Sequence, residues 1–402
     1  MRDVGLPRGW CFLALILACA TLHAQGPVLP PVHLIGRMGS SLNDSLETVL
    51  SVRELSDGRV IVQAPGNHVL LVYDTAFARA DTLLGGGGSA AQAYPAQLAL
   101  PIIAGPADTT LLVDRASLAL LVIDGQGSVR TSALPPGDIM LSMGQGTASD
   151  RHGRLVFRQR ATRLIPTPDP SGRGPPFYTA PDSDPIVRFN MASLKIDTAG
   201  WARGPRQYPA VRTVDPDGTM WDTQVRNPLP QPDAWAVLAD GTIAIVRAQD
   251  YHIDWISPDG VHSGSPRLPH QWHRYTDSEH TALLDSIEAL ARVAPQVQSS
   301  YDGTKSRLQT NLFPAADDLP NYEAAFVGPV YADADDRLWI RETRSDAGNE
   351  YGPVYEIVSR GGEVTARVRL PNGAAIVGFG VGCVYLSTRL GHRVTLVRFA
   401  IP

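Results

Sequence analysis

The chain has 402 residues, of which 44% are hydrophobic, and its 35 basic and 40 acidic side chains give a formal net charge of -5. A chain of this length can bury a substantial core without disulfide bonds. The mild acidity, with no basic cluster along any segment, argues against nucleic acid as a partner. No run of about 18 apolar residues follows the first residues, so we expect no transmembrane span beyond the N-terminal segment.

The first residues have the order of a targeting segment. Arg2 and Arg8 supply positive charge, residues 10–20 are apolar but short for a membrane span, and small residues follow up to Ala24. This order is typical of a secretory signal peptide. We therefore predict that residues 1–24 are removed, that residues 25–402 form a single domain, and that the protein is exported to the periplasm or secreted.

A second interpretation of this segment is open. Residues 16–19 are similar to a bacterial lipobox, in which Cys19 would carry a lipid anchor to the cell envelope. Cleavage after Ala24 would instead leave Cys383 as the only thiol, and no intrachain disulfide could form. Cys383 lies in an apolar, strand-like run, so we expect a small buried side chain.

One pattern recurs along the rest of the chain: a turn with small or acidic residues, an alternating strand, a short polar loop and a second strand. Gly58, Thr109 and Gly153 occupy the same turn position at spacings of 51 and 44 residues. Such spacings suit four-stranded propeller blades, which bury their faces only against neighbouring blades. The six copies of the pattern fall at residues 55–74, 108–124, 150–190, 238–256, 333–368 and 382–399.

The pattern predicts an all-β protein, a single six-bladed β-propeller, with two stacked β-sandwiches as the competing architecture. Closing the ring needs an early strand in the last blade, and residues 31–36 are available for this role.

Two stretches exceed the length of a blade. Residues 215–221 read as a turn entering a strand, and we expect them to form the outer hairpin of an enlarged third blade. Residues 269–325 are predicted to be a helical insertion. Within it, Thr276 and Glu279 have capping-box spacing, and apolar residues at helical spacing follow until Pro295, which predicts a helix over residues 276–294.

Several segments resemble NHL-type repeats of exported bacterial proteins. Asn67-His68-Val69 stands where that family has its Asn-His-Leu signature. The other matching segments are the glycine-rich run 83–88, Tyr94-Pro95, and the strands 111–115 and 120–124. The resemblance covers most of residues 30–402 and is degenerate outside the first two blades. It implies a six-bladed propeller and little about chemistry, because propellers host both binding and catalysis.

The histidines fall into two groups. His68, His252 and His392 occupy one equivalent position in the repeats, which favours a structural role. His270 and His273 have a His-x-x-His spacing that can serve zinc, but no fixed carboxylate accompanies them in this loop. We therefore predict no metal and no cofactor. If the loop caps the ring, we expect ligand contacts from His270, Trp272, His273 and Tyr275.

Other motifs have simpler explanations. Residues 215–218 and 333–336 are similar to fragments of calcium loops but lack the distal glutamate, so we expect hairpin turns. The glycine run at 85–88 lacks the Lys-Ser/Thr of a phosphate loop, and no Gly-x-Ser-x-Gly elbow occurs. No catalytic residue is identified.

Two functional hypotheses remain. The first is a binding or scaffold protein outside the cytoplasm that presents its loops to a peptide, a glycan or an envelope protein. The second is a metal-assisted lactonase or lyase whose site lies in the propeller channel and is built by several blades.

Overall fold

The computed structural model describes residues 29–402 except for 43–45, 86–92, 95–99, 115–116, 118, 133–142, 145, 151, 160–164, 168–176, 294–297, 301–305, 309–311, 345–350 and 392. The predicted signal peptide, Cys19 and His392 therefore lie outside the described residues. None of the described helices is long and apolar enough to cross a membrane.

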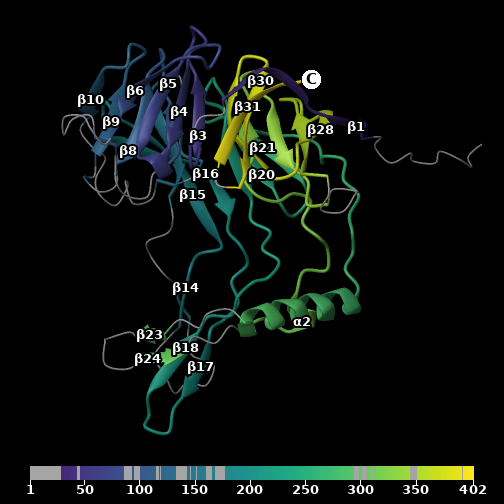
Figure 1. The fold of residues 1–402 in the computed structure, drawn as a ribbon. Helices are drawn as coiled ribbons and strands as arrows, with labels where there is room; N and C mark the ends of the chain where they lie inside the picture. Colours follow the sequence, from purple (N-terminus) through teal and green to yellow (C-terminus); the bar gives the residue numbers. More distant parts are fainter. Residues whose placement is uncertain are drawn as a thin grey trace, which may run out of the picture.

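Six blades of four antiparallel strands each form a ring, so the predicted six-bladed β-propeller is confirmed (Figure 1). The first blade comprises β3 (Ser51–Glu54), β4 (Val60–Ala64), β5 (Val69–Tyr73) and β6 (Ala80–Leu84). The second comprises β7 (Ile103–Ala104), β8 (Thr110–Asp114), β9 (Ala119–Ile123) and β10 (Val129–Ser132). The third comprises β11 (Ala148–Ser149), β12 (Arg154–Arg158), β15 (Ser183–Asn190) and β16 (Lys195–Arg203). The fourth comprises β19 (Ala234–Val237), β20 (Ile243–Arg247), β21 (His252–Ile256) and β22 (His262–Gly264). The fifth comprises β25 (Tyr331–Ala332), β26 (Leu338–Arg341), β27 (Val354–Val358) and β28 (Val364–Arg369). The sixth comprises β29 (Ala374–Gly380), β30 (Cys383–Leu390), β31 (Arg393–Ala400) and, from the N-terminal segment, β2 (Gly36–Leu42).

The core is divided among six hydrophobic clusters, one between each pair of neighbouring blades. Strand β4 shows how a blade serves two clusters. Val60 and Val62 pack toward the sixth blade, whereas Ile61 packs toward the second. Successive side chains of a strand point to opposite faces, so a strand between two blades needs apolar side chains on both faces. The cluster between the sixth and first blades completes the circle.

The N-terminal segment closes the ring in a way that differs from our expectation. Residues Val32–Leu34 form β1, which pairs in parallel with β28 of the fifth blade. The next residues form β2, which pairs antiparallel with β31 and completes the last blade. We expected residues 31–36 to fill that place. The polar, glycine-containing sequence of β2 carried little strand signal, although its last residue, Leu42, is buried between the sixth and first blades.

Polar contacts reinforce the same junction. The Tyr385 hydroxyl donates a hydrogen bond to the Glu54 carboxylate, and the Val381 amide donates to the same group over 3.3 Å. Cys383 is a buried free thiol, as predicted, and burial raises its pKa to about 11. The thiol therefore serves as packing at this junction.

The inner strands β29 and β3 come unusually close where the ring closes. A Cβ atom added to Gly378 would lie 2.1 Å from the Val52 carbonyl oxygen and 2.9 Å from its carbonyl carbon. Both atoms belong to the backbone, so they cannot rotate away. Only glycine allows the sixth and first blades to meet at this distance.

We predict that Gly378→Ala lowers the free energy of unfolding by about 1–3 kcal/mol, the usual cost of overpacking a core. Urea unfolding followed by circular dichroism would measure the change. Gly36→Ala, where an added Cβ has no neighbour within 4 Å, is the matched control. Equal stability of the two variants would contradict the close approach.

All the inserted elements leave the ring on one face (Figure 1). They occupy connections from the second to the third strand of a blade or from one blade to the next, and these connections share a face. They are β13 (Ile165–Thr167), β14 (Phe177–Thr179), β17 (Val211–Val214), β18 (Met220–Thr223), α2 (Asp277–Val293), β23 (Gln298–Ser300), β24 (Ser306–Leu308) and the 3-10 helix η3 (Ala316–Asp318); η1 (Pro65–Asn67) is a short turn within the first blade.

The structure corrects one prediction about these insertions. Residues 211–223 do form a hairpin, but β17 and β18 make a two-stranded sheet of their own. The outer strand of the third blade is β16, which pairs with β15 along its whole length. The chain then leaves the ring between β16 and β17 (Figure 1). The turn sequence identified the hairpin but not the sheet to which it belongs.

The helical insertion is confirmed within residues 269–325. Helix α2 spans Asp277–Val293. Its capping box is formed, because the Thr276 amide donates to the Glu279 carboxylate over 2.8 Å and the Glu279 amide donates to the Thr276 hydroxyl over 3.3 Å. Only His280 of the helix is buried, so α2 stands away from the ring rather than packing into it (Figure 1).

Candidate functional site

Two adjoining hollows lie where the third and fourth blades meet the inserted segments. Their volumes are about 760 and 680 Å³. Arg203, Gln249, Asp250 and Arg267 line both of them, so the two hollows form one continuous cleft. The cleft lies on the face of the ring from which the insertions leave.

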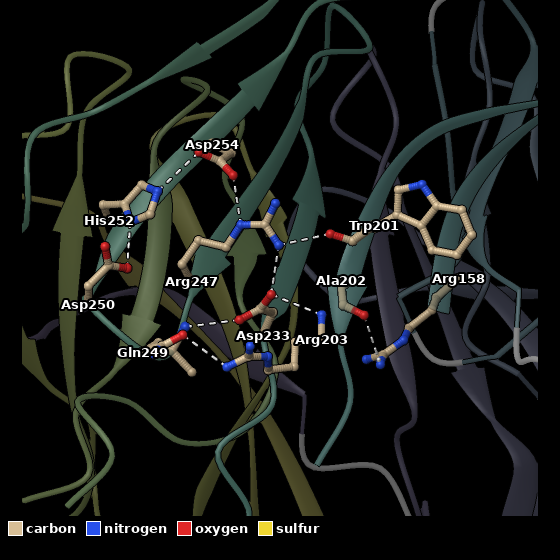
Figure 2. A network of polar contacts seen from close by, with 11 residues as sticks. Arg158, Trp201, Ala202, Arg203, Asp233, Arg247, Gln249, Asp250, His252 and Asp254 are labelled. Carbon is tan, nitrogen blue, oxygen red and sulfur yellow. Dashed lines mark hydrogen bonds and ion pairs between the residues drawn. The ribbon is translucent and has the colours of Figure 1, made fainter. Parts of the chain in front are cut away.

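The Asp233 carboxylate organises the floor of this cleft (Figure 2). Asp233 is buried directly before the inner strand β19. Its side chain accepts hydrogen bonds from the Arg203 amide over 2.9 Å, from the Ala248 amide over 3.0 Å and from the Arg247 guanidinium over 2.7 Å. One carboxylate therefore joins the end of the third blade to two parts of the fourth.

Arg247 extends the network to a row of acidic residues. Its Nε donates to Asp254 over 2.7 Å, and its Nη1 donates to the Trp201 carbonyl over 2.8 Å. The ring of His252 lies between two carboxylates, with Nδ1 2.7 Å from Asp250 and Nε2 3.1 Å from Asp254 (Figure 2). These side chains come from β20, β21 and the turn between them, so the blade itself sets their positions.

An aromatic row forms one wall. Tyr251 stacks on Phe326 at a centroid distance of 5.9 Å and meets the edge of His270 at 5.6 Å. His270 in turn meets Trp272 at 4.9 Å, and Trp272 meets Tyr322 at 6.3 Å, both edge to face. The row begins in the buried core and ends in the cleft, where Trp272 is 39% and Tyr322 48% exposed.

Beside this wall, hydrogen bonds join the 269–325 insertion to the connection between the third and fourth blades, residues 204–233. Gln231 donates to the Tyr322 carbonyl over 2.7 Å. The Tyr208 hydroxyl and the Arg206 guanidinium both donate to the Asp318 carbonyl over 3.0 Å, and Arg206 also lies over the Tyr208 ring at 4.9 Å. This connection lines the cleft at residues 204–206, 227, 229 and 231, so it forms a second wall that is hydrogen-bonded to the segment carrying the first.

The predicted ligand-contact residues lie at different places. Trp272 lines the cleft. His270 packs behind it, and burial lowers the pKa of its imidazole. His273 lies 3.0 Å from Glu279 at the start of α2, and Tyr275 packs on His280 at 5.1 Å. His270 and His273 therefore have different partners.

The sequence did not identify the polar residues of the cleft. Arg203, Gln249 and Arg267 stand in segments with no motif, and folding brings them together. His252 was assigned a structural role from its repeat position, and the structure places it in the smaller hollow between two aspartates. His68, its repeat equivalent, instead ends the η1 turn with a left-handed φ of 53°.

The aromatic row also reaches a buried acid. Glu356, on β27, is 1% exposed and accepts a hydrogen bond from the Tyr251 hydroxyl. The pKa of Glu356 is raised to about 7, chiefly by burial and also by the nearby Glu342 carboxylate, whereas the hydrogen bond from Tyr251 and the charge of Arg367 act to lower it. Burial, with the carboxyl group of Glu356, also raises the pKa of Tyr251. This contact links the fourth and fifth blades.

We predict that Glu356 makes stability pH-dependent. Its folded-state pKa lies above the ordinary 4.5, so the folded protein binds the proton more tightly than the unfolded chain. The resulting stabilisation is complete below pH 4.5 and is lost as the pH rises through about 7, a change of about 3 kcal/mol.

Denaturant unfolding at several pH values between 5 and 8 would measure this slope. Glu356→Gln should flatten it, whereas Glu363→Gln, on an exposed turn, should leave it as in the wild type. An unchanged slope in Glu356→Gln would show that other groups cause the pH dependence.

The two aspartate-rich segments form hairpin turns, as expected. Trp221 Nε1 donates to Asp215 over 2.6 Å, and Trp339 Nε1 donates to Asp333 over 3.0 Å. Among the described residues, no group of three or more His, Cys, Asp or Glu side chains is arranged to hold a metal ion.

No family model matches the chain, and no curated protein sequence matches it. Solved structures of similar fold include a member of the duf4221 family from Bacteroides vulgatus, with 9% identity and a TM-score of 0.45 over 93% of this chain and 99% of that one. Virginiamycin B lyase from Staphylococcus aureus has 10% identity and a TM-score of 0.41 over 90% and 99%. A gluconolactonase from Xanthomonas campestris has 10% identity and a TM-score of 0.40 over 93% and 98%.

These similarities are too distant to carry an argument about activity. The resemblance to NHL-type repeats stays a prediction beyond the six-bladed architecture itself.

Proposed function

We propose that the protein is an exported binding protein that holds its ligand in the cleft between the third and fourth blades and the insertion. The observation that supports this most directly is the pairing of a rigid polar floor with an exposed aromatic wall. A largely preformed concavity with a few fixed polar groups is the usual form of a ligand site.

The floor favours binding over catalysis. The carboxylates of Asp233, Asp250 and Asp254 are each occupied by hydrogen bonds or ion pairs that hold the chain in place. Such groups position a site, whereas a general acid or base must be free to exchange a proton with the substrate. We assign the three aspartates to the frame of the cleft.

The proposed location follows from the N-terminal segment alone. Arg2, Arg8 and the apolar run that follows indicate export. A lipid on Cys19 would retain the protein at the envelope, whereas cleavage after Ala24 would release it. Mass spectrometry of the N-terminal peptide of the mature protein distinguishes the two.

We predict that Trp272→Ala weakens ligand binding by about tenfold or more, because an aromatic anchor of a site commonly contributes more than 1 kcal/mol. A panel of oligosaccharides and short peptides, screened by thermal shift and then calorimetry on the full mature chain, would supply the ligand. Leu290→Ala, on the exposed side of α2, is the control and should bind as the wild type does.

Two results would overturn the proposal. One is a ligand whose affinity is equal in the wild type and in both Trp272→Ala and Tyr322→Ala. The other is a stoichiometric calcium or zinc in the purified protein together with turnover of a lactone, since that would favour the metal-assisted enzyme with a channel site.

A further inference from the structure

The dimensions of the cleft limit the ligand to a few rings or residues. Each hollow falls within the 300–1,000 Å³ that is usual for small-ligand sites, at about 760 and 680 Å³. Because four residues line both hollows, the hollows adjoin and an elongated ligand can occupy both.

The larger hollow is basic, although the whole chain is acidic. Three arginines and two aspartates line it. Arg203 Nη1 donates to the Gln249 side chain over 2.9 Å, whereas the one acidic side chain that Arg267 reaches in the described part of the chain is Asp250, at 4.0 Å, and Arg267 is 78% exposed. Asp250 is already held by His252 at 2.7 Å. The positive charge of Arg267 is therefore only weakly paired with an acidic side chain of the protein, which favours a ligand that brings a carboxylate or another anion.

The walls also match a ligand with flat rings and hydroxyl groups. The exposed parts of Trp272 and Tyr322 offer apolar, rigid surfaces, and the edge-to-face contacts that these rings make fix their orientation. Gln249 uses its oxygen for Arg203, which leaves its amide group to donate. Gln231 uses its amide group for the Tyr322 carbonyl, which leaves its oxygen to accept. Hydroxyl groups both donate and accept, so they suit this pair.

An extended peptide fits less well. Peptides that add to a sheet need a free strand edge with a run of backbone donors and acceptors. Among the described lining residues, only the ends of strands contribute: Trp201 and Arg203 come from the last part of β16, and β22, the outer strand of the fourth blade, contributes none.

From these features we propose that the cleft binds an acidic oligosaccharide, with a sugar ring against Trp272 and Tyr322 and its carboxylate at Arg267. This inference rests on the proposed binding function and names the ligand class for the same site.

Calorimetry with the trimer of galacturonic acid and with its fully methyl-esterified form tests the inference, because esterification removes the negative charge of each ring and adds only a methyl group. We expect the acid to bind about tenfold or more tightly than the ester, and Arg267→Gln to remove most of this difference. Arg292→Gln, which is 76% exposed on α2 and outside the cleft, should bind the acid as the wild type does. Added salt should weaken binding of the acid and not of the ester.

Other outcomes separate this inference from the proposed function. Equal binding of acid and ester, with loss of both in Trp272→Ala, would overturn the acidic class and leave a sugar-binding cleft. Binding of an acidic peptide such as tri-glutamate in place of the trimer would overturn the sugar class alone. Trimer binding that is unaffected by Trp272→Ala and Arg267→Gln would overturn both.

Discussion

Every blade of this ring must bury both of its faces against neighbouring blades, and the rest of the structure depends on that constraint. It requires strands such as β4 to be apolar on both sides, with Val60 and Ile61 serving opposite interfaces. It also requires the circle to close, which β2 accomplishes by completing the last blade. Polar groups at the interfaces are tolerated where they are bonded: Gln63, fully buried, accepts from Ser51 over 2.5 Å and donates to the Leu100 carbonyl over 2.9 Å.

Because the hydrophobic core is formed mainly between the blades, the segments that leave the ring contribute little to it. Helix α2 buries a single side chain, and the insertion contributes to the molecule mainly through the aromatic wall and its hydrogen bonds to residues 206–231. The cleft therefore combines two kinds of element. Its floor belongs to the blades and is held by Asp233, and the exposed part of its aromatic wall, Trp272 and Tyr322, belongs to the connection between the fourth and fifth blades. Sites on such connections, positioned by a rigid scaffold, are a general feature of proteins.

The sequence predicted the ring well because its strongest signals are local. Gly58, Gly153 and Gly241 have φ angles of 83°, 73° and 90°, and each donates to the carbonyl three residues earlier in the same turn. Gly218 repeats this geometry with a φ of 84°, yet its hairpin stands outside every blade. A turn of this kind is determined by four or five residues, whereas membership of a sheet depends on partners far away in the chain. The same limit explains why the pairing of β1 with the fifth blade was missed.

The cleft was predictable only where its composition was unusual. A loop rich in aromatic residues and histidine drew attention to Trp272, which does line it. The arginines and amides gave no signal, because their segments meet only after the third and fourth blades have packed. His252 illustrates the difficulty further. Its repeat position is shared with His68, so the pattern treats the two alike, but only His252 has aspartates on both sides of its ring. The repeat sets where a strand starts, and the neighbours that each blade acquires decide whether that position takes part in a site.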